Sequence, residues 1–269
     1  MTREEKILSR IDKQKAGIEI GPSHAPVAPK KAGFHVEIID HLSREALIKK
    51  YTGHNVNLDN IEEVDFIWSG QSYAQLTGRH NYYDWAIASH VIEHTPDLIS
   101  FLRQCEEILN DNGILSLAIP DSRYHFDYFR PITGISKIID AYIARNTIHS
   151  AGTAAEYYLN CTKRGGEIAW DNTSDKEFSL MYLQTEAYNK MQLVIQQQEY
   201  LDLHSWDFTP TSFRLIIQDL NDLGFISLKE VEFYPTAGCE FFITLAKNGK
   251  GFVQDRLSAL KTIKTELSV

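Results

Sequence analysis

The 269-residue sequence has few cysteines, no long hydrophobic run and no excess of basic residues. Its three cysteines are odd in number and form no CxxC pair, so neither a disulfide framework nor a cysteine zinc site is expected. No stretch approaches the roughly 18 apolar residues that signal a membrane span. The first fifteen residues also lack the apolar segment of a signal peptide. These absences predict a soluble, cytoplasmic protein.

The charge balance argues against nucleic acid as a partner. Lysine and arginine number 27 against 36 aspartates and glutamates, which gives a net charge of −9. Because binding to nucleic-acid phosphates depends on clustered basic side chains, nucleic acid is not expected as the partner. The phosphate-binding motifs GxGxxG and GxxxxGK[ST] are absent as well, which disfavours a pyrophosphate or triphosphate ligand.

What the sequence does contain is an alternation of short apolar runs with amphipathic segments. A helix is expected to open at Thr95-Pro96-Asp97, with the Thr95 hydroxyl as cap, and to close at Asn112-Gly113. The apolar runs that we interpret as strands cover 16–21, 34–40, 64–70, 82–90 and 114–120. The alternation predicts an α/β, Rossmann-like, doubly wound sheet that is mostly parallel, because such strands are buried on both faces.

Residues 121–205 interrupt this rhythm and are rich in Tyr, Gln, Asn and His. We interpret 131–202 as a helical insertion after the fifth strand, serving as a lid or as an oligomer surface, which leaves a homodimer open. The rhythm resumes with a helix capped by Thr209, followed by an antiparallel C-terminal hairpin over 227–235 and 239–247. The whole of 1–269 is therefore expected to form a single domain.

The turn after the first strand carries small residues at Gly21, Ser23 and Ala25, which let a ligand approach the backbone closely. Nineteen positions after Gly21, Asp40 ends the second strand, where an acid can accept two hydrogen bonds from a ribose diol. No Lys or Arg stands in the turn before Lys30. A nucleoside without phosphates therefore fits best, and S-adenosylmethionine is the common one.

Four segments resemble class I S-adenosylmethionine-dependent methyltransferases. They are GIEIGPS (17–23), VEIIDHLS (36–43), YYDWAIASHVIEHTPDLISFL (82–102) and ILNDNGILSLAIPD (108–121). The chain is similar to the branch whose methyltransferase domains accompany glycosyltransferases in bacterial polysaccharide clusters. The resemblance implies S-adenosyl-L-methionine as cofactor, a role in polysaccharide biosynthesis, and O-methylation of a saccharide or another small polar acceptor.

The resemblance also assigns cofactor-binding residues, which share a place at the carboxyl ends of the first four strands. They are Glu19, Gly21, Pro22 and Ser23 along the methionine part, Asp40 at the ribose, His41 and Leu42 beside the adenine, Gly70 and Gln71 at the adenine edge, and Ser89 and His90 on the sulfonium side. The chain departs from the family at Ser23 and Ala25, where glycine is usual. Its Pro-rich 22–29 segment also leaves little room for the first crossover helix.

The segment HVIEH (90–94) also matches H-x-x-E-H, an inverted zinc-hydrolase motif. That chemistry needs both histidines on one helical face and a third ligand elsewhere. Because the helix is expected only after Thr95, His90 and His94 should point differently, and we expect no metal. His94 is our catalytic candidate, either orienting a substrate hydroxyl or acting as general base. A non-catalytic binding protein with this fold and, less favoured, a zinc hydrolase remain alternatives.

Overall fold

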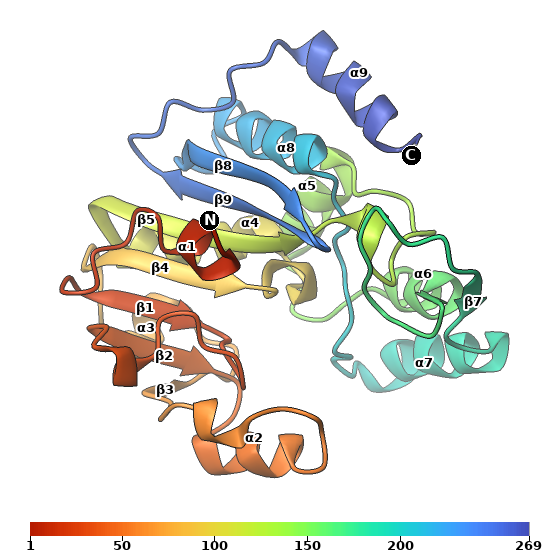
Figure 1. The fold of residues 1–269 in the computed structure, drawn as a ribbon, viewed down its shortest axis with the longest axis horizontal. Helices are drawn as coiled ribbons and strands as arrows, with labels where there is room; N and C mark the ends of the chain where they lie inside the picture. The colour runs from red at the N-terminus through yellow and green to blue at the C-terminus, as the bar shows by residue number, and fades with distance from the viewer. Residues whose placement is uncertain (269) are drawn as a thin grey trace.

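The computed structural model describes residues 1–268, and seven of its strands form one twisted sheet (Figure 1). The strands are β1 (Gly17–Ile20), β2 (Val36–Asp40), β3 (Phe66–Ile67), β4 (Tyr83–Ser89), β5 (Leu109–Pro120), β8 (Lys229–Ala237) and β9 (Glu240–Ala246). Their order is β3-β2-β1-β4-β5-β9-β8. The first five run parallel, and β9 is antiparallel to both β5 and β8. The Rossmann-like prediction with an antiparallel hairpin strand is thus confirmed.

The helices of the described residues lie against this sheet or within the insertion. They are α1 (Arg3–Ile7), α2 (Arg44–Tyr51), α3 (Tyr73–Thr77), α4 (Leu98–Ile108), α5 (Ile135–Ala144), α6 (Ala151–Asn160), α7 (Gln184–Gln197), α8 (Pro210–Asp222) and α9 (Arg256–Glu266). Short 3₁₀ turns are η1 (Lys30–Ala32), η2 (Leu58–Asn60), η3 (Ile92–His94) and η4 (Ser122–Tyr124). The main core joins the sheet to α3, α4, α5 and α8, whereas a second cluster joins α1 and the Pro-rich loop to the other face.

The first crossover contains no α-helix. Between β1 and β2 the chain forms the Pro-rich loop and the single turn η1, as the sequence predicts. Side chains alternate along β1, so Ile18 and Ile20 join the main core while Gly17 and Glu19 face the loop side. A Cβ on Gly17 would lie 2.0 Å from the Trp85 indole, so only glycine fits there.

The boundaries of α4 differ from the prediction. Thr95 does not cap the helix, because its hydroxyl donates to the Ile92 carbonyl at 2.7 Å within the turn that precedes it. Asp97 is the cap instead and accepts from the Ser100 N–H at 2.9 Å. Asn112-Gly113 does not end the helix either, since α4 stops at Ile108 and that pair lies inside the long strand β5.

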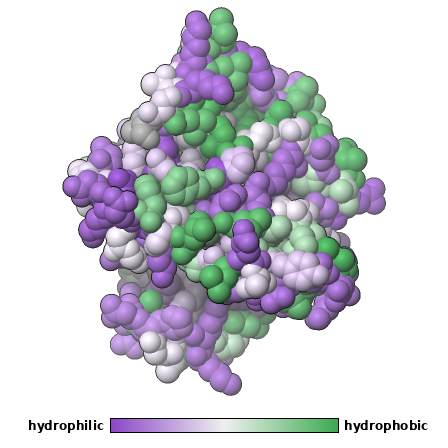
Figure 2. Space-filling view, turned by 90° about the vertical axis from the view of Figure 1, so that its right-hand side faces the viewer, coloured by the Kyte–Doolittle hydropathy of each residue, from purple (hydrophilic) through white to green (hydrophobic). Residues whose placement is uncertain are grey.

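The insertion contains α5, α6 and α7 as expected, and also a small antiparallel hairpin of β6 (Thr162–Arg164) and β7 (Phe178–Leu180), which the sequence did not indicate. The chain leaves and returns at adjacent points, where the Thr133 N–H donates to the Asp207 carbonyl at 2.8 Å. In Figure 1 the parallel strands point toward α6 and α7. Figure 2 looks onto this side and shows hydrophobic residues gathered among hydrophilic ones.

The C-terminal elements follow the prediction. Thr209 caps α8, Pro210 takes its first position, and the Phe208 and Phe213 rings pack with centroids 5.0 Å apart. The hairpin β8–β9 then turns through Gly238, whose φ is 65°. Among the described residues, no helix combines the length and apolar character that a membrane span needs.

Candidate cofactor and acceptor site

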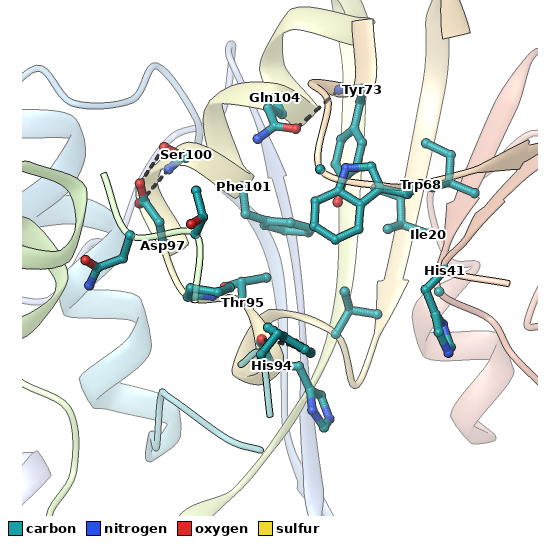
Figure 3. A pocket seen from close by; sticks show the side chains of 18 of the residues that line it. Ile20, His41, Trp68, Tyr73, His94, Thr95, Asp97, Ser100, Phe101 and Gln104 are labelled. Carbon is teal, nitrogen blue, oxygen red and sulfur yellow. Dashed lines mark hydrogen bonds between the residues drawn. The ribbon is translucent and has the colours of Figure 1, made fainter. Parts of the chain in front are cut away.

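A cavity of about 870 Å³ opens at the carboxyl ends of β1, β2 and β4 (Figure 3). Chain order reverses between β1 and β4, because β2 and β3 lie on one side of β1 while β4 and β5 lie on the other. Ligands of open α/β sheets bind at this kind of switch point. Of the predicted site residues, those that line the cavity are Gly21, Asp40, His41, Gly70 and His94.

The turn after β1 and the carboxylate that ends β2 are in direct contact. Asp40 is buried, and its Oδ2 accepts a hydrogen bond from the Ser23 N–H at 2.9 Å. Its Oδ1 accepts from the His41 N–H at 2.7 Å and lies 2.6 Å from the His41 Nδ1. Gly21 has a φ of 64°, and a Cβ there would meet Val91 at 3.0 Å. The turn therefore needs glycine at this position and presents bare backbone to the cavity.

Aromatic side chains that no sequence motif indicated form another wall. Trp68, Tyr73 and Phe101 surround one side of the cavity in Figure 3. The Trp68 Nε1–H donates to the Gln71 carbonyl at 2.7 Å, which holds the indole at the mouth. The predicted adenine contact of Gln71 is not supported, because its side-chain oxygen accepts from the Ser69 N–H at 2.9 Å and the residue does not line the cavity.

Glu19 lies away from the cavity and serves the Pro-rich loop. Its buried carboxylate accepts from the N–H groups of Val27 and Ala28 at 2.7 and 3.0 Å. Burial raises its pKa to about 7, against the opposing effect of these two hydrogen bonds. The predicted neighbours Pro22, Ser23 and Leu42 do not line the cavity either. The Ser23 N–H donates its hydrogen bond to Asp40, so it is not available to a ligand.

Ser89 and His90, which we predicted on the sulfonium side, do not line the cavity. The Ser89 hydroxyl accepts from the Arg3 guanidinium at 2.6 Å, and the His90 Nε2 lies 2.8 Å from the Glu240 carboxylate. Arg3 binds that same carboxylate at 2.7 Å. These residues therefore join α1 to β4 and β9. Burial opposes the charged form of His90, but Glu240 outweighs it and raises the pKa of the ring.

The turn η3 is fastened to the segment that returns from the insertion. The Ser205 N–H donates to the Glu93 carbonyl at 2.6 Å, and the Tyr200 hydroxyl donates to the His94 carbonyl at 3.1 Å. The His94 Nδ1 lies 2.8 Å from the Asp202 carboxylate. Burial disfavours the charged form of His94, yet its bond to Asp202 and the charge of Glu93 outweigh this and raise its pKa. The prediction that His90 and His94 do not share a helical face is confirmed, because His90 lies before the turn η3 that contains His94.

A buried polar cluster lies behind His94. The His204 Nδ1 is 2.5 Å from Asp127, and the Arg130 guanidinium donates to the other oxygen of Asp127 at 2.7 Å. Burial would raise the pKa of Asp127, but His204 and Arg130 outweigh it and hold that pKa well below its usual value. Burial lowers the pKa of His125, next in this cluster, to about 4. The cluster ties the start of the insertion to its end.

The insertion supplies the wall opposite the cofactor-side strands. Its cavity-lining residues combine aromatic rings with polar groups, namely Tyr142, Ile143, Arg145, Asn146, Thr147 and Tyr200. No sequence pattern indicates chemistry in this segment, because its residues come from helix ends and loops that only the fold brings to the cavity.

This topology and a cavity at its switch point define the class I methyltransferase architecture. The family model described as a methyltransferase domain matches residues 4–160, more than half of the chain. The chain belongs to this family, and it is an S-adenosylmethionine-dependent methyltransferase.

Several solved structures are similar to this chain at low sequence identity. A methyltransferase from Aquifex aeolicus is 12% identical, with a TM-score of 0.45 over 90% of this chain and 88% of its own. The CcbJ methyltransferase from Streptomyces caelestis is 12% identical, with a TM-score of 0.46 over 91% of this chain and 88% of its own. No curated protein sequence matches the chain.

Proposed function

We propose that this protein methylates a hydroxyl of a saccharide or of another small polar acceptor. The observation that supports the site most directly is the hydrogen bond between the Ser23 N–H and Asp40 on the wall of the large cavity. It joins a glycine turn to a buried carboxylate at the place where an adenosine would need both.

The residues of the cavity fit S-adenosylmethionine. Gly21 allows close approach to the backbone, Asp40 can accept from the ribose hydroxyls, and Trp68 offers a face on which an adenine ring stacks. His41 and Gly70 complete this side. When bound, the cofactor supplies a methyl group already activated on a sulfonium. The protein must therefore mainly position and orient the acceptor, which can contribute roughly 7–11 kcal/mol.

The remaining space suits a small polar acceptor. Ligand pockets span about 300–1,000 Å³, and the volume of about 870 Å³ lies near the upper end. The insertion contributes the faces of Tyr142 and Tyr200 beside the amide of Asn146 and the hydroxyl of Thr147. Flat aromatic faces next to hydrogen-bonding groups match the alternating apolar and hydroxyl-bearing faces of a sugar ring.

We assign His94 to the acceptor hydroxyl. A bond forms between the hydroxyl oxygen and the methyl carbon while the bond from that carbon to sulfur breaks, so the hydroxyl must give up its proton. His94 lines the cavity on the insertion side, whereas His41 lies beside Asp40, the carboxylate that we assign to the ribose. The His94 ring can orient the hydroxyl and accept its proton, and such assistance contributes about 10²–10⁴-fold.

Two measurements test this function in sequence. Calorimetry should show binding of S-adenosylmethionine and S-adenosylhomocysteine, and methyl-tritiated cofactor should label a glycan extract. His94→Gln should leave cofactor affinity within about twofold and lower label transfer by about 10²-fold or more. The matched control is His80→Gln, an exposed histidine outside the cavity. Absence of cofactor binding would refute the site, whereas binding with label only in other acceptors would refute the saccharide.

A further inference from the structure

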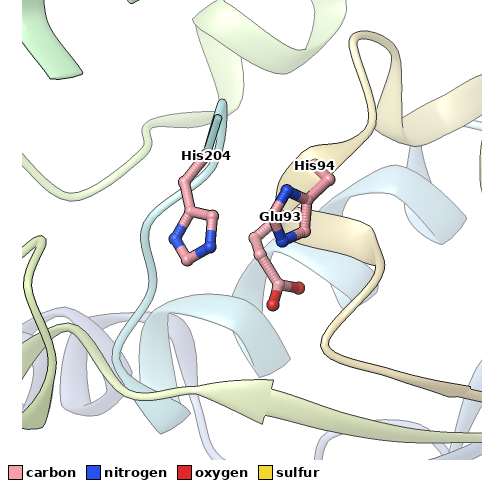
Figure 4. A group of neighbouring side chains, drawn as sticks. All are labelled: Glu93, His94 and His204. Carbon is pink, nitrogen blue, oxygen red and sulfur yellow. The ribbon is translucent and has the colours of Figure 1, made fainter. Parts of the chain in front are cut away.

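Three side chains beside the cavity present ligand atoms to one another. The carboxylate of Glu93 and one ring nitrogen each of His94 and His204 all lie within 4.8 Å of one another (Figure 4). Glu93 and His94 belong to η3, whereas His204 comes from the segment that returns from the insertion. The bond from the Ser205 N–H to the Glu93 carbonyl, at 2.6 Å, holds the two segments together.

Glu93 is the unusual member of this group. Its side chain is 1% exposed, and neither carboxylate oxygen has a hydrogen-bond partner among the described residues. The nearest basic group, the His90 Nδ1, lies 3.5 Å away and is itself engaged through its other nitrogen with Glu240. A carboxylate removed from water without hydrogen bonds is strongly destabilising. A bound cation would give these two oxygens the partner that they lack.

Each of the two histidines has a carboxylate beside one ring nitrogen. His204 directs Nδ1 to Asp127 at 2.5 Å, and His94 directs Nδ1 to Asp202 at 2.8 Å. A carboxylate beside one ring nitrogen leaves the other nitrogen for an ion, as the outer partners of metal-bound histidines do. Zinc bonds of about 2.0–2.1 Å require tetrahedral ligands about 3.4 Å apart, so small side-chain movements from the observed spacing suffice.

A neighbouring group is less suited to a cation. His125, Asp127 and His204 also lie within 4.8 Å of one another. Asp127, however, already pairs with Arg130 at 2.7 Å and with His204, so its charge is compensated. Of these two groups, the Glu93 group combines a buried carboxylate that has no hydrogen bond with a residue, His94, that lines the cavity.

We propose that Glu93, His94 and His204 bind one divalent transition-metal ion of the zinc class. Two imidazoles and one carboxylate are a ligand set that such ions accept. Three protein ligands would leave a fourth position, and His94, which lines the cavity, brings the group next to it. The motif H-x-x-E-H is thus used differently from the hydrolase pattern, because His204 takes the place of His90.

The role of the ion, unlike its binding, rests on the proposed function. An acceptor hydroxyl on the fourth position would have its oxygen polarised by the ion and would lose its proton more readily to water in the open cavity. With the ion bound, His94 would act as a ligand in place of the base assigned to it above, the ion would orient the acceptor, and water would take the proton.

The test is direct binding of Zn²⁺ to the full chain, first stripped by a chelator and then titrated in competition with a chromogenic chelator. We expect one ion per chain, with affinity lowered about 100-fold or more in Glu93→Gln and in His204→Gln. His80→Gln should bind as the wild type does. Calorimetry with S-adenosylmethionine on every variant shows whether the fold and the cofactor site persist. A protein that binds the cofactor but not Zn²⁺ would refute the metal site alone, and one that binds Zn²⁺ but not the cofactor would refute the proposed function alone.

Two results would overturn the proposal: no stoichiometric Zn²⁺ binding by the wild type, or unchanged affinity in both variants. If the variants do not fold, X-ray absorption at the zinc edge of the loaded wild type decides. Two imidazoles and one carboxylate at about 2.0–2.2 Å support the site, and any other ligand set contradicts it.

Discussion

Replacing Asp40 with asparagine should weaken binding of S-adenosylmethionine without unfolding the protein. The carboxylate offers about four lone-pair positions. The Ser23 N–H, the His41 N–H and the His41 ring occupy three of them. One position remains for a ribose hydroxyl, and a second becomes free if the His41 ring, which is 48% exposed, turns outward.

The magnitude follows from these contacts. A hydrogen bond to a charged group is worth about 1.5–3 kcal/mol. Asp40→Asn removes the charge and one accepting oxygen, so we expect the loss of about one such bond, or roughly 10–100-fold in Kd. His41→Ala should bind the cofactor as tightly as the wild type or more tightly, because it frees a lone pair of Asp40.

Calorimetric titration of both variants measures these effects. The control is Glu37→Gln on the same strand, whose carboxylate pairs with Arg79 at 3.0 Å and lies outside the cavity. Thermal unfolding of each variant identifies any general loss of structure. Wild-type affinity in a folded Asp40→Asn protein would show that the ribose does not lie at Asp40.

Three further predictions follow from single contacts. Trp68→Ala should weaken cofactor binding by about 1–3 kcal/mol through lost stacking, measured by the same calorimetry, with the exposed Tyr82→Ala, outside the cavity, unchanged. Gly17→Ala should lower the free energy of unfolding by about 1–3 kcal/mol or more, because its Cβ would lie 2.0 Å from the Trp85 indole; urea unfolding indistinguishable from wild type contradicts this. The pKa of Glu19 is raised from 4.5 to about 7 in the folded protein. As pH rises, the Glu19 carboxyl therefore loses its proton in the unfolded chain before it does so in the folded protein. Between pH 4.5 and 7 this difference lowers the free energy of unfolding by up to about 3 kcal/mol. Glu19→Gln should remove that decline in urea unfolding at pH 5 and 7.5, and an identical pH slope in both proteins argues against it.

The sequence predicted most of the sheet because its signals are local. The cap predicted at Thr209, for example, opens α8 with Pro210 in its first position. The errors arose where a local signal served another purpose. Thr95 resembles a cap, but the 3₁₀ turn before it uses the hydroxyl. Asn112-Gly113 resembles a helix end, but pairing with β4 draws the start of β5 back to Leu109.

The candidate site was predictable only in part, for a similar reason. Gly21 and Asp40 end adjacent parallel strands, so their contact follows from the fold class. His204 and Asp127 are in contact although 77 positions separate them in the sequence, so no local pattern predicts their pairing. Trp68 had one usable signal, since it directly follows the third strand at the carboxyl edge of the sheet.

The missing first crossover helix has an electrostatic consequence for the choice of ligand. In nucleotide-binding folds a helix begins just after the glycine turn, and its positive end favours phosphate. Here the Pro-rich loop follows Gly21, and Glu19 holds the N–H groups of Val27 and Ala28. The turn therefore offers no helix terminus to an anion, while Asp40 places a carboxylate beside it. This arrangement disfavours a phosphorylated nucleotide and favours a nucleoside that carries a positive charge, which is the property that distinguishes a sulfonium cofactor.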